Sequence, residues 1–383
     1  MLDGRGRRRL ALRQRGLWLD ALAITVAVGG LLLVAVSLNV LPGSRAWGFD
    51  FGAYFRAAVR LAETGTPYAA DTLAGAFRPG PAGLYLYSPL LAQVLQPLVG
   101  LGEASAALAW YALRVGALVA ACLLMPISLR LRLAMIGIAG LSLVTLVDLG
   151  LGNVSLIVTL LTVIAWRYLD RPAAGVAVAL TLFLRPTMGL LLGWWLVRGR
   201  YRPLAWAVGG GLVLVVLSVA LIGLRPYVDY VTLLGNLTDV TGVPFNIDLA
   251  SVAWHLGAPP ALVQLALLSS YLLAVGAVLL SLRRDRELSF AVVSVAVLFA
   301  APLLWDHYLT QLLVPAALLA SRGRWWGLAL PLLTWLPQGS LAFVALAALI
   351  ALFLAPDRGE PALSSSPFGR WLRTREGVAV QRS

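Results

Sequence analysis

The stretch LWLDALAITVAVGGLLLVAVSLNVL, residues 17–41, contains one charged residue, Asp20, close to its beginning. It is long enough to cross a bilayer, because a membrane-spanning helix needs about 20 mostly apolar residues. It is too long for the apolar core of a cleavable signal peptide. The stretch therefore predicts a first transmembrane helix, in which Asp20 has a structural role near the cytoplasmic end.

The composition of the whole chain fits the same class of protein. Hydrophobic residues make up 60% of the 383 residues and charged residues 12%, and the mean hydropathy is +0.86. Soluble domains carry about 25% charged residues. Cys122 is the one cysteine in the sequence, so no intramolecular disulfide can form. These values predict an all-α polytopic membrane protein.

The apolar runs predict about twelve spans. They lie near residues 17–41, 103–125, 131–148, 153–168, 172–184, 187–198, 203–223, 259–282, 288–303, 307–320, 325–336 and 340–354. Arg185-Pro186 divides residues 172–198 into two short helices, and Pro337-Gln338-Gly339 divides residues 325–354.

The net charge of +13 reflects membrane topology and not a nucleic-acid partner. Arginines occupy the tail at residues 5–15 and every second connection between spans, and such positive residues remain cytoplasmic. They are Arg130, Arg132, Arg167, Arg171, Arg198, Arg200, Arg202, Arg283, Arg284, Arg286, Arg322 and Arg324. The pattern predicts a bacterial plasma-membrane protein with both termini cytoplasmic. Residues 1–16 form a basic tail, residues 17–354 one transmembrane domain, and residues 355–383 a disordered cytoplasmic tail.

The remaining connections are predicted to be extracytoplasmic, and they hold most of the polar side chains. These are Asp50, Tyr54, Asp148, Asn153, Arg185, Asn246, Asp248, Asp306 and His307. Polar and charged groups at membrane depth are costly and are usually functional. Because several segments place such groups on one face, the sequence predicts a site there.

The first of these connections, residues 42–102, is the longest. Residues 50–62 are predicted to form an amphipathic interfacial helix, with Phe51, Phe55, Ala58 and Ala62 on its apolar side and arginines directed to lipid headgroups. The stretch YLYSPLLAQVLQPLVG, residues 85–100, predicts a second interfacial or re-entrant helix.

A set of short motifs in this order resembles a known family. The motifs are Asp50-x-x-x-Tyr54, GTPY (65–68), YSPL (87–90), GN (152–153), LRP (184–186) and WDHY (305–308). Together, over residues 49–313, they resemble glycosyltransferase family 87, the polyprenol-phosphate-mannose-dependent mannosyltransferases of the GT-C superfamily. Two positions depart from the family pattern: Arg185 stands where lysine is common, and Tyr308 where a second histidine is frequent.

The resemblance implies a GT-C-type fold and an inverting hexosyltransferase, mannosyltransferase-like, with a polyprenyl-phosphate sugar as donor and a lipid or glycan as acceptor. It implies Asp50 as general base and Arg185 with His307 as the groups that bind the donor phosphate. Contacts to the substrates are expected from Tyr54, Asn153, Asn246, Asp248 and Asp306. A lone carboxylate is too few oxygen ligands for a hard cation, so no metal and no cofactor is expected.

Each of these residues also has a simpler interpretation. Asp50 has a residue type favoured as an N-cap and stands where the interfacial helix begins. Arg185 could extend to the membrane interface, and Asp306 could cap a helix on which His307 faces water. The other polar residues could serve packing.

Two other classes of function stay open. A transporter or flippase for a lipid-linked sugar would carry charges within its spans and inverted repeats, and Arg114 is the feature that favours it. A noncatalytic assembly factor is the third class. The gathering of charges at one membrane face favours an enzyme.

Overall fold

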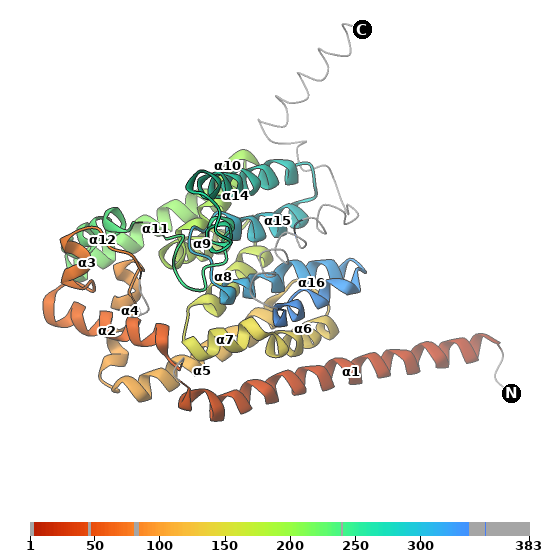
Figure 1. Cartoon of the computed structure of the whole chain (residues 1–383). Coiled ribbons are helices and arrows are strands. Elements are labelled where there is room, and N and C mark those ends of the chain that lie inside the picture. The colour runs from red at the N-terminus through yellow and green to blue at the C-terminus, as the bar shows by residue number, and fades with distance from the viewer. Residues whose placement is uncertain (1–3, 45–46, 80–83, 239, 337–348, 350–383) are drawn as a thin grey trace, which may run out of the picture.

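The computed structural model describes residues 4–44, 47–79, 84–238, 240–336 and 349. In this part of the chain the regular structure is helical, and the only β contact is an isolated bridge between Phe77 and Leu237. The helices are packed into one bundle, with α1 along one side (Figure 1). The all-α prediction is confirmed.

The α-helices are α1 Gly4–Val40, α2 Phe49–Thr64, α3 Ala70–Ala74, α4 Pro89–Val99, α5 Glu103–Leu124, α6 Leu129–Leu141, α7 Leu143–Leu151, α8 Ser155–Arg167, α9 Pro172–Leu184, α10 Leu190–Val197, α11 Tyr201–Ile222, α12 Arg225–Asn236, α13 Leu249–His255, α14 Pro260–Ser281, α15 Arg286–Phe299 and α16 Leu313–Ser321. Short 3₁₀ helices are η1 Leu41–Gly43, η2 Pro186–Gly189, η3 Asp306–Leu312, η4 Trp325–Ala329 and η5 Leu332–Trp335.

Four helical segments are long and apolar enough to cross a membrane: Leu17–Gly43, Glu103–Leu124, Tyr201–Ile222 and Pro260–Ser281. A fifth results if α6 and α7, bent by 64° at their junction, are one broken span. Several shorter apolar helices accompany them. The chain is thus a multi-pass helical membrane protein, while the count of about twelve spans stays a prediction.

Three predicted spans differ from the structure. Residues 131–148 are divided between α6 and α7 because Ser142 has an extended backbone, and its hydroxyl donates to the carbonyl of Pro331 at 3.0 Å. The span at 307–320 begins as the 3₁₀ helix η3. Residues 325–336 form two 3₁₀ turns in place of an α-helix. The predicted span at 340–354, except residue 349, and the tail at 355–383 lie outside the described residues.

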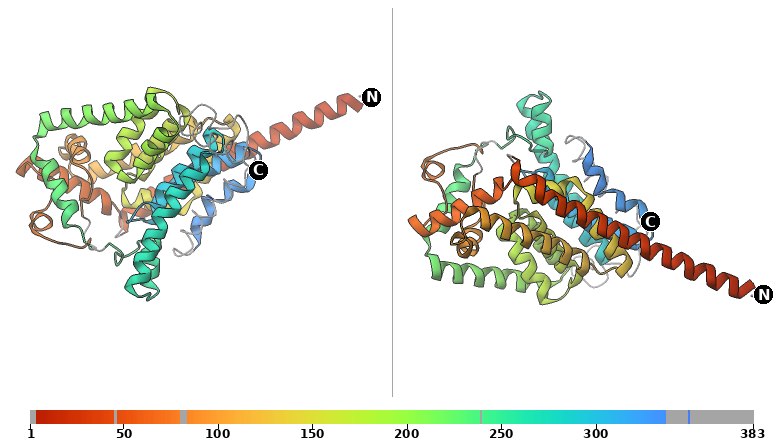
Figure 2. Two further views of the ribbon diagram at one scale, coloured as in Figure 1. Left: turned by 90° about the horizontal axis from the view of Figure 1, so that it is seen from above. Right: turned by 90° about the horizontal axis from the view of Figure 1, so that it is seen from below.

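The predicted break at Arg185-Pro186 is confirmed. Arg185 has φ −148° and ψ 99°, an extended conformation, which is the conformation that a following proline favours. Helix α9 therefore ends at Leu184, and η2 and α10 continue the chain. Residues 4–16 of the predicted basic tail are helical and belong to α1, which projects beyond the bundle (Figure 2).

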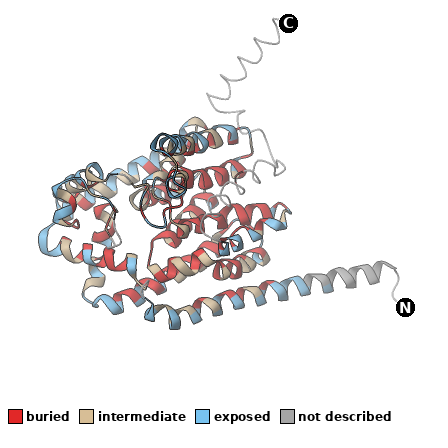
Figure 3. Cartoon of the chain, viewed as in Figure 1, coloured by how far each residue is buried: buried red, intermediate tan, exposed pale blue. Residues whose placement is uncertain are grey.

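The centre of the bundle is formed by α15 and α16, which are buried almost all round (Figure 3). A helix that is apolar on every side belongs in such a position. Helices α1, α11 and α14 instead lie at the periphery, with large apolar side chains exposed along them. Exposed apolar faces of this kind are what lipid contact requires.

The connections between helices gather in two groups. Helices α2, α3, α4 and α12 lie together at one end of the bundle, which we name the cavity end (Figure 1). The arginine-rich connections contact one another elsewhere: Asp170 pairs with Arg286 and, at 3.6 Å, with Arg200, and Arg322 pairs with Asp285 at 2.6 Å. We name this second group, around residues 168–171, 198–200, 283–286 and 322–324, the basic end. The arginine-rich connections of the basic end, which the sequence predicted to share one side of the membrane, therefore lie together in the structure.

Candidate active site

The cavity end contains a cavity of about 250 Å³. Segments distant in sequence form its wall: the first turns of α2, the strand-like segment before α4, the junction of α9 and η2, helix α12, and the segment before η3. The lining residues are Asp50, Tyr54, Leu84, Leu86, Tyr87, Asn153, Phe183, Leu184, Arg185, Pro186, Thr187, Tyr230, Leu234, Leu237, Ala301, Pro302, Leu303, Trp305 and Tyr308. Ligand pockets commonly combine such an apolar wall with a few polar groups.

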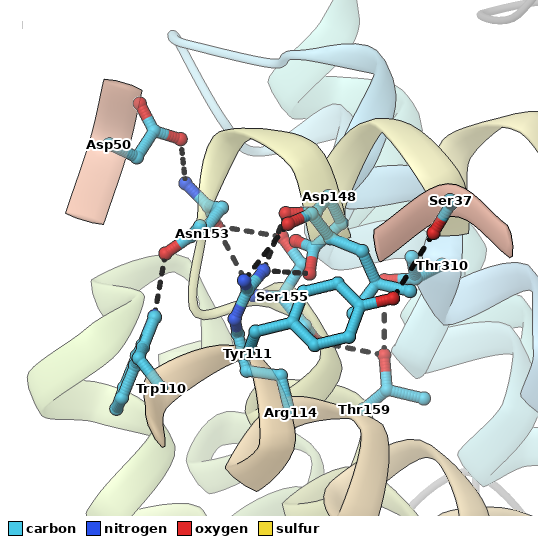
Figure 4. Close-up of polar contacts among 12 residues, drawn as sticks. Ser37, Asp50, Trp110, Tyr111, Arg114, Asp148, Asn153, Ser155, Thr159 and Thr310 are labelled. Atoms are coloured by element: carbon cyan, nitrogen blue, oxygen red, sulfur yellow. Dashed lines mark hydrogen bonds and ion pairs between the residues drawn. The ribbon is translucent and has the colours of Figure 1, made fainter. Parts of the chain in front are cut away.

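Asp50 lies in the first turn of α2 and reaches toward the turn that follows α7 (Figure 4). The N-cap of α2 is Gly48, and the helix start has no side-chain cap bond, so the interpretation of Asp50 as a cap is wrong. Its Oδ2 atom accepts a hydrogen bond from Nδ2 of Asn153 at 2.8 Å. Asp50 is the one acid among the described residues that line the cavity.

The orientation of the Asn153 amide follows from its other contacts. Its Oδ1 atom accepts from the backbone N–H of Ser155 at 3.1 Å and from the Ser155 hydroxyl at 2.8 Å. A backbone N–H can only donate, so the oxygen must face Ser155. The amide NH₂ group therefore faces Asp50.

A glycine permits this close approach. Gly152 has φ +83°, and a Cβ atom there would lie 2.6 Å from Cβ of Phe51 in α2. The Trp110 indole N–H donates to the Gly152 carbonyl at 2.8 Å, and the backbone N–H of Gly48 donates to the carbonyl of Gly150 at 2.8 Å. The turn is thus held directly against the start of α2.

Two tyrosines complete the wall beside Asn153. The Tyr54 hydroxyl lies 3.1 Å and the Tyr87 hydroxyl 3.2 Å from Nδ2 of Asn153, and Tyr54 donates to Tyr87 at 3.0 Å. Burial raises the pKa of both phenols well above the usual value, so both remain neutral hydroxyls at physiological pH. They can offer hydrogen bonds to a sugar.

Arg185 ends α9 and is 5% exposed. Its guanidinium carbon lies 3.5 Å from the centroid of the Tyr308 ring, and its Nη2 donates to the hydroxyl of Ser155. Nε and Nη1 have no hydrogen-bond partner. The side chain is buried against the cavity and does not extend to a surface, which excludes the interpretation that it reaches the membrane interface.

His307 is 3% exposed, so the interpretation that it faces water is wrong. Its ring stacks on Trp305 with centroids 6.1 Å apart and planes 13° from parallel, and neither ring nitrogen has a hydrogen-bond partner. The Asp306 carboxylate accepts from the backbone N–H of His307 at 2.7 Å. The cavity lining is formed by their neighbours Trp305 and Tyr308, and neither His307 nor Asp306 belongs to it.

Asn246 and Asp248 also lie outside the cavity lining. The Asn246 amide donates to the Pro302 carbonyl at 3.0 Å, and its oxygen accepts from the backbone N–H of Leu304 at 2.9 Å. Asp248 is the N-cap of α13 and accepts from the backbone N–H of Ala250 at 2.8 Å. The structure thus uses both side chains to fold the loop beside the site, and their contact with substrate stays a prediction.

Arg114 supports the site from behind. It is 1% exposed, donates to the carbonyls of Asp148 at 2.6 Å and Leu149 at 3.0 Å, and lies 3.5 Å from the Asp148 carboxylate. These contacts fix the end of α7, immediately before the turn that carries Asn153 (Figure 4). The charge that favoured a transporter is therefore engaged within the protein.

The sequence interpretation missed Tyr87, Ser155 and Tyr308 as parts of the site. Each lies within or next to a motif: Tyr87 in YSPL, Ser155 two residues after Asn153, and Tyr308 in WDHY. Their positions in or beside these motifs are the signal that could have found them. The contact of the Tyr308 ring with Arg185, and the contacts of the Ser155 hydroxyl with Arg185 and Asn153, depend on tertiary structure.

The arrangement places one carboxylate and one guanidinium on a single cavity. The guanidinium, with two N–H groups unengaged, suits an anion such as phosphate, which arginine binds through parallel hydrogen bonds. The carboxylate suits proton acceptance from a hydroxyl. Tyr54, Tyr87 and Trp305 supply hydrogen bonds and ring faces between them.

Fold and site define a multi-pass helical membrane protein with a charged cavity at one end of its bundle. The sequence model of glycosyltransferase family 87 matches residues 85–305. The chain belongs to this family and is a membrane glycosyltransferase, as the motifs predicted. No curated protein and no solved structure matches the chain. The matched range includes Tyr87, Asn153 and Arg185 of the cavity.

Proposed function

We propose that this glycosyltransferase transfers a hexose, mannose by the family resemblance, from a polyprenyl-phosphate sugar to a hydroxyl of a lipid or glycan acceptor. The observation that carries the proposal is that Asp50 and Arg185, from helices far apart in sequence, line one cavity. A single displacement requires a base for the acceptor hydroxyl and an anion-binding group for the leaving phosphate at one site.

In the proposed reaction the acceptor hydroxyl attacks the anomeric carbon and its proton passes to the Asp50 carboxylate. The bond from that carbon to the phosphate oxygen breaks, and polyprenyl phosphate leaves from the opposite face with the bonding electrons. The anomeric configuration is inverted. Proton removal by a positioned carboxylate contributes roughly 10²–10⁴-fold to the rate.

Arg185 supports the leaving group in this scheme. The charge that develops on the phosphate meets Nε and Nη1, which have no partner within the protein. A buried group already in place stabilises developing charge without reorganising at the moment of reaction. The Tyr308 ring, whose centroid lies 3.5 Å from the guanidinium carbon, packs against the guanidinium. The scheme needs no metal and no cofactor.

The site faces the extracytoplasmic side in this proposal, because the arginine-rich connections gather at the basic end and positive residues remain inside. A lipid-linked donor suits this location. Its tail can stay among the apolar helices while the phosphate reaches Arg185, and nucleotide sugars are not supplied on that side. We infer the bacterial plasma membrane and cytoplasmic termini from the same charge distribution.

The donor class can be tested with purified protein and a radiolabelled sugar, presented either on polyprenyl phosphate or on a nucleotide. We expect transfer from the lipid donor alone. Transfer from the nucleotide, with no lipid intermediate formed, would overturn the proposed mechanism. Movement of the intact lipid-linked sugar across proteoliposomes without transfer would instead support the flippase alternative.

A further inference from the structure

A continuous chain of side chains joins the two charged groups of the cavity. The Arg185 Nη2 donates to the hydroxyl of Ser155, and this hydroxyl donates to Oδ1 of Asn153 at 2.8 Å. Nδ2 of Asn153 donates in turn to Oδ2 of Asp50 at 2.8 Å. Ser155 is fully buried at the first position of α8, and Figure 4 shows it beside Asn153.

We propose that Ser155 is a positioning residue that couples the phosphate-binding guanidinium of Arg185 to the carboxylate of Asp50. The inference rests on the proposed function. Ser155 does not line the cavity, so it acts through the two residues that it contacts and not on the substrates.

The geometry gives the Ser155 hydroxyl two separate effects. As an acceptor it holds one amino group of Arg185, while Nε and Nη1 have no hydrogen-bond partner in the protein. As a donor it completes, with its own backbone N–H, the pair of bonds that orient the Asn153 amide. Removing the hydroxyl should therefore weaken donor binding and, separately, loosen the group that holds Asp50.

The chain also provides a matched control on the same helix. Thr162 is 1% exposed, and its hydroxyl donates to the carbonyl of Val158 one turn earlier, at 2.8 Å. Thr162→Val removes a buried hydroxyl of α8 while keeping the side-chain shape. We expect Thr162→Val to change neither kcat nor the donor KM by more than about twofold.

The test measures kcat and the donor KM with polyprenyl-phosphate mannose for purified variants of the full chain. We expect Ser155→Ala to lower kcat about tenfold, the size of one buried hydrogen bond, and to raise the donor KM several-fold. Ser155→Thr, which keeps the hydroxyl, should recover most of both. If Ser155→Ala does not fold, Ser155→Cys, with a weakly hydrogen-bonding thiol, should show the same two changes.

A second variant, Asn153→Ala, distinguishes coupling between Arg185 and Asp50 from a general loss of folding. In an Asn153→Ala protein the path from Ser155 to Asp50 is already broken, so adding Ser155→Ala should leave kcat unchanged while it still raises the donor KM. An additive loss in kcat would overturn the inference, as would an effect on KM alone in the single variant. An inactive wild-type protein would overturn the proposed function, and the coupling with it.

Discussion

Arg185 and Arg322 are about equally withdrawn from solvent, with exposures of 5% and 6%, yet their surroundings differ. Arg322, at the basic end, donates to both oxygens of Asp285 at 2.6 Å. Arg185, at the cavity end, donates to one hydroxyl and lies on an aromatic ring, with two N–H groups unengaged. A buried guanidinium with unengaged nitrogens is costly, so we infer that the protein has a use for it.

Two other buried arginines, Arg114 and Arg198, lie among the described residues, and Arg185 differs from both in lining the cavity. Arg114 contacts two carbonyls and the Asp148 carboxylate, and Arg198 donates to the carbonyl of Arg284 at 2.9 Å. We infer that Arg114 and Arg322 maintain the fold, while Arg185, which lines the cavity with Nε and Nη1 unengaged, is held ready for a ligand. Each of the following predictions tests this difference.

The first prediction concerns the sides of the membrane on which the two ends lie. In a Cys122→Ser background, Gly75→Cys should react with an impermeant thiol reagent on intact cells, because the proposed topology places it outside. Arg283→Cys should react only after permeabilisation. Both positions are exposed, whereas Cys122 is buried. Reaction at 283 and not at 75 on intact cells would reverse the orientation.

The second prediction compares two aspartates. Asp50→Asn should lower transfer by roughly 10²–10⁴-fold, because an amide keeps the shape of the side chain but cannot accept the proton, and thermal stability should be unchanged. Asp285→Asn should instead lower the melting temperature, because Arg322 loses its counter-ion. Initial rates and thermal unfolding in detergent measure both. Transfer by Asp50→Asn above a few per cent of wild type would place the base elsewhere.

The third prediction compares the two arginines. Arg185→Ala should lower transfer by about 10²-fold or more, the size of one lost transition-state donor, with a larger effect on the donor than on the acceptor. Arg185→Lys should retain part of the activity through its charge. Arg322→Ala should cost about 3–5 kcal/mol of unfolding free energy, because it removes one member of a buried ion pair.

Kinetics with each substrate varied in turn, and unfolding curves for each variant, measure these changes. If Arg185→Ala impairs the kinetics with the donor and with the acceptor equally and also lowers stability, Arg185 has the same structural role as Arg322.

The fourth prediction compares two glycines with the same backbone conformation. Gly152 and Gly323 both have φ +83°, but a Cβ atom at Gly152 would meet Phe51, while the one at Gly323 meets nothing within 4 Å. Gly152→Ala should lower transfer about tenfold, because it moves Asn153 away from Asp50 and small displacements of catalytic groups are costly. Gly323→Ala carries the same backbone strain and should lower transfer less than twofold. Equal rates for the two variants would show that the close approach at Gly152 is unimportant.

Hydropathy and charge patterns were sufficient for much of the fold. Residues 172–184 form α9 as predicted, and the break at Arg185-Pro186 lies where the proline requires it. Hydropathy did not predict the 64° bend within residues 131–148, since Ser142 at the bend contacts Pro331, far along the chain. Residues 325–336 are apolar enough for a span, but periodicity does not distinguish an α-helix from consecutive 3₁₀ turns.

The candidate site was predictable in part. The structure brings Asp50, Tyr54, Asn153 and Arg185 to one cavity, and sequence motifs had singled out all four. It engages Asn246 and Asp248 in the loop instead, which residue type could not reveal, because an amide or carboxylate near a turn looks the same whether it contacts backbone or substrate. The Tyr308 ring under Arg185 is a tertiary contact without a local signal.

The most direct test of the central claim is an experimental structure of the protein with polyprenyl phosphate bound. We predict the phosphate within hydrogen-bond distance of the Arg185 guanidinium, with the Asp50 carboxylate in the same cavity and Arg322 still paired with Asp285. A phosphate bound at the basic end, or in the cavity but away from Arg185, would contradict the account.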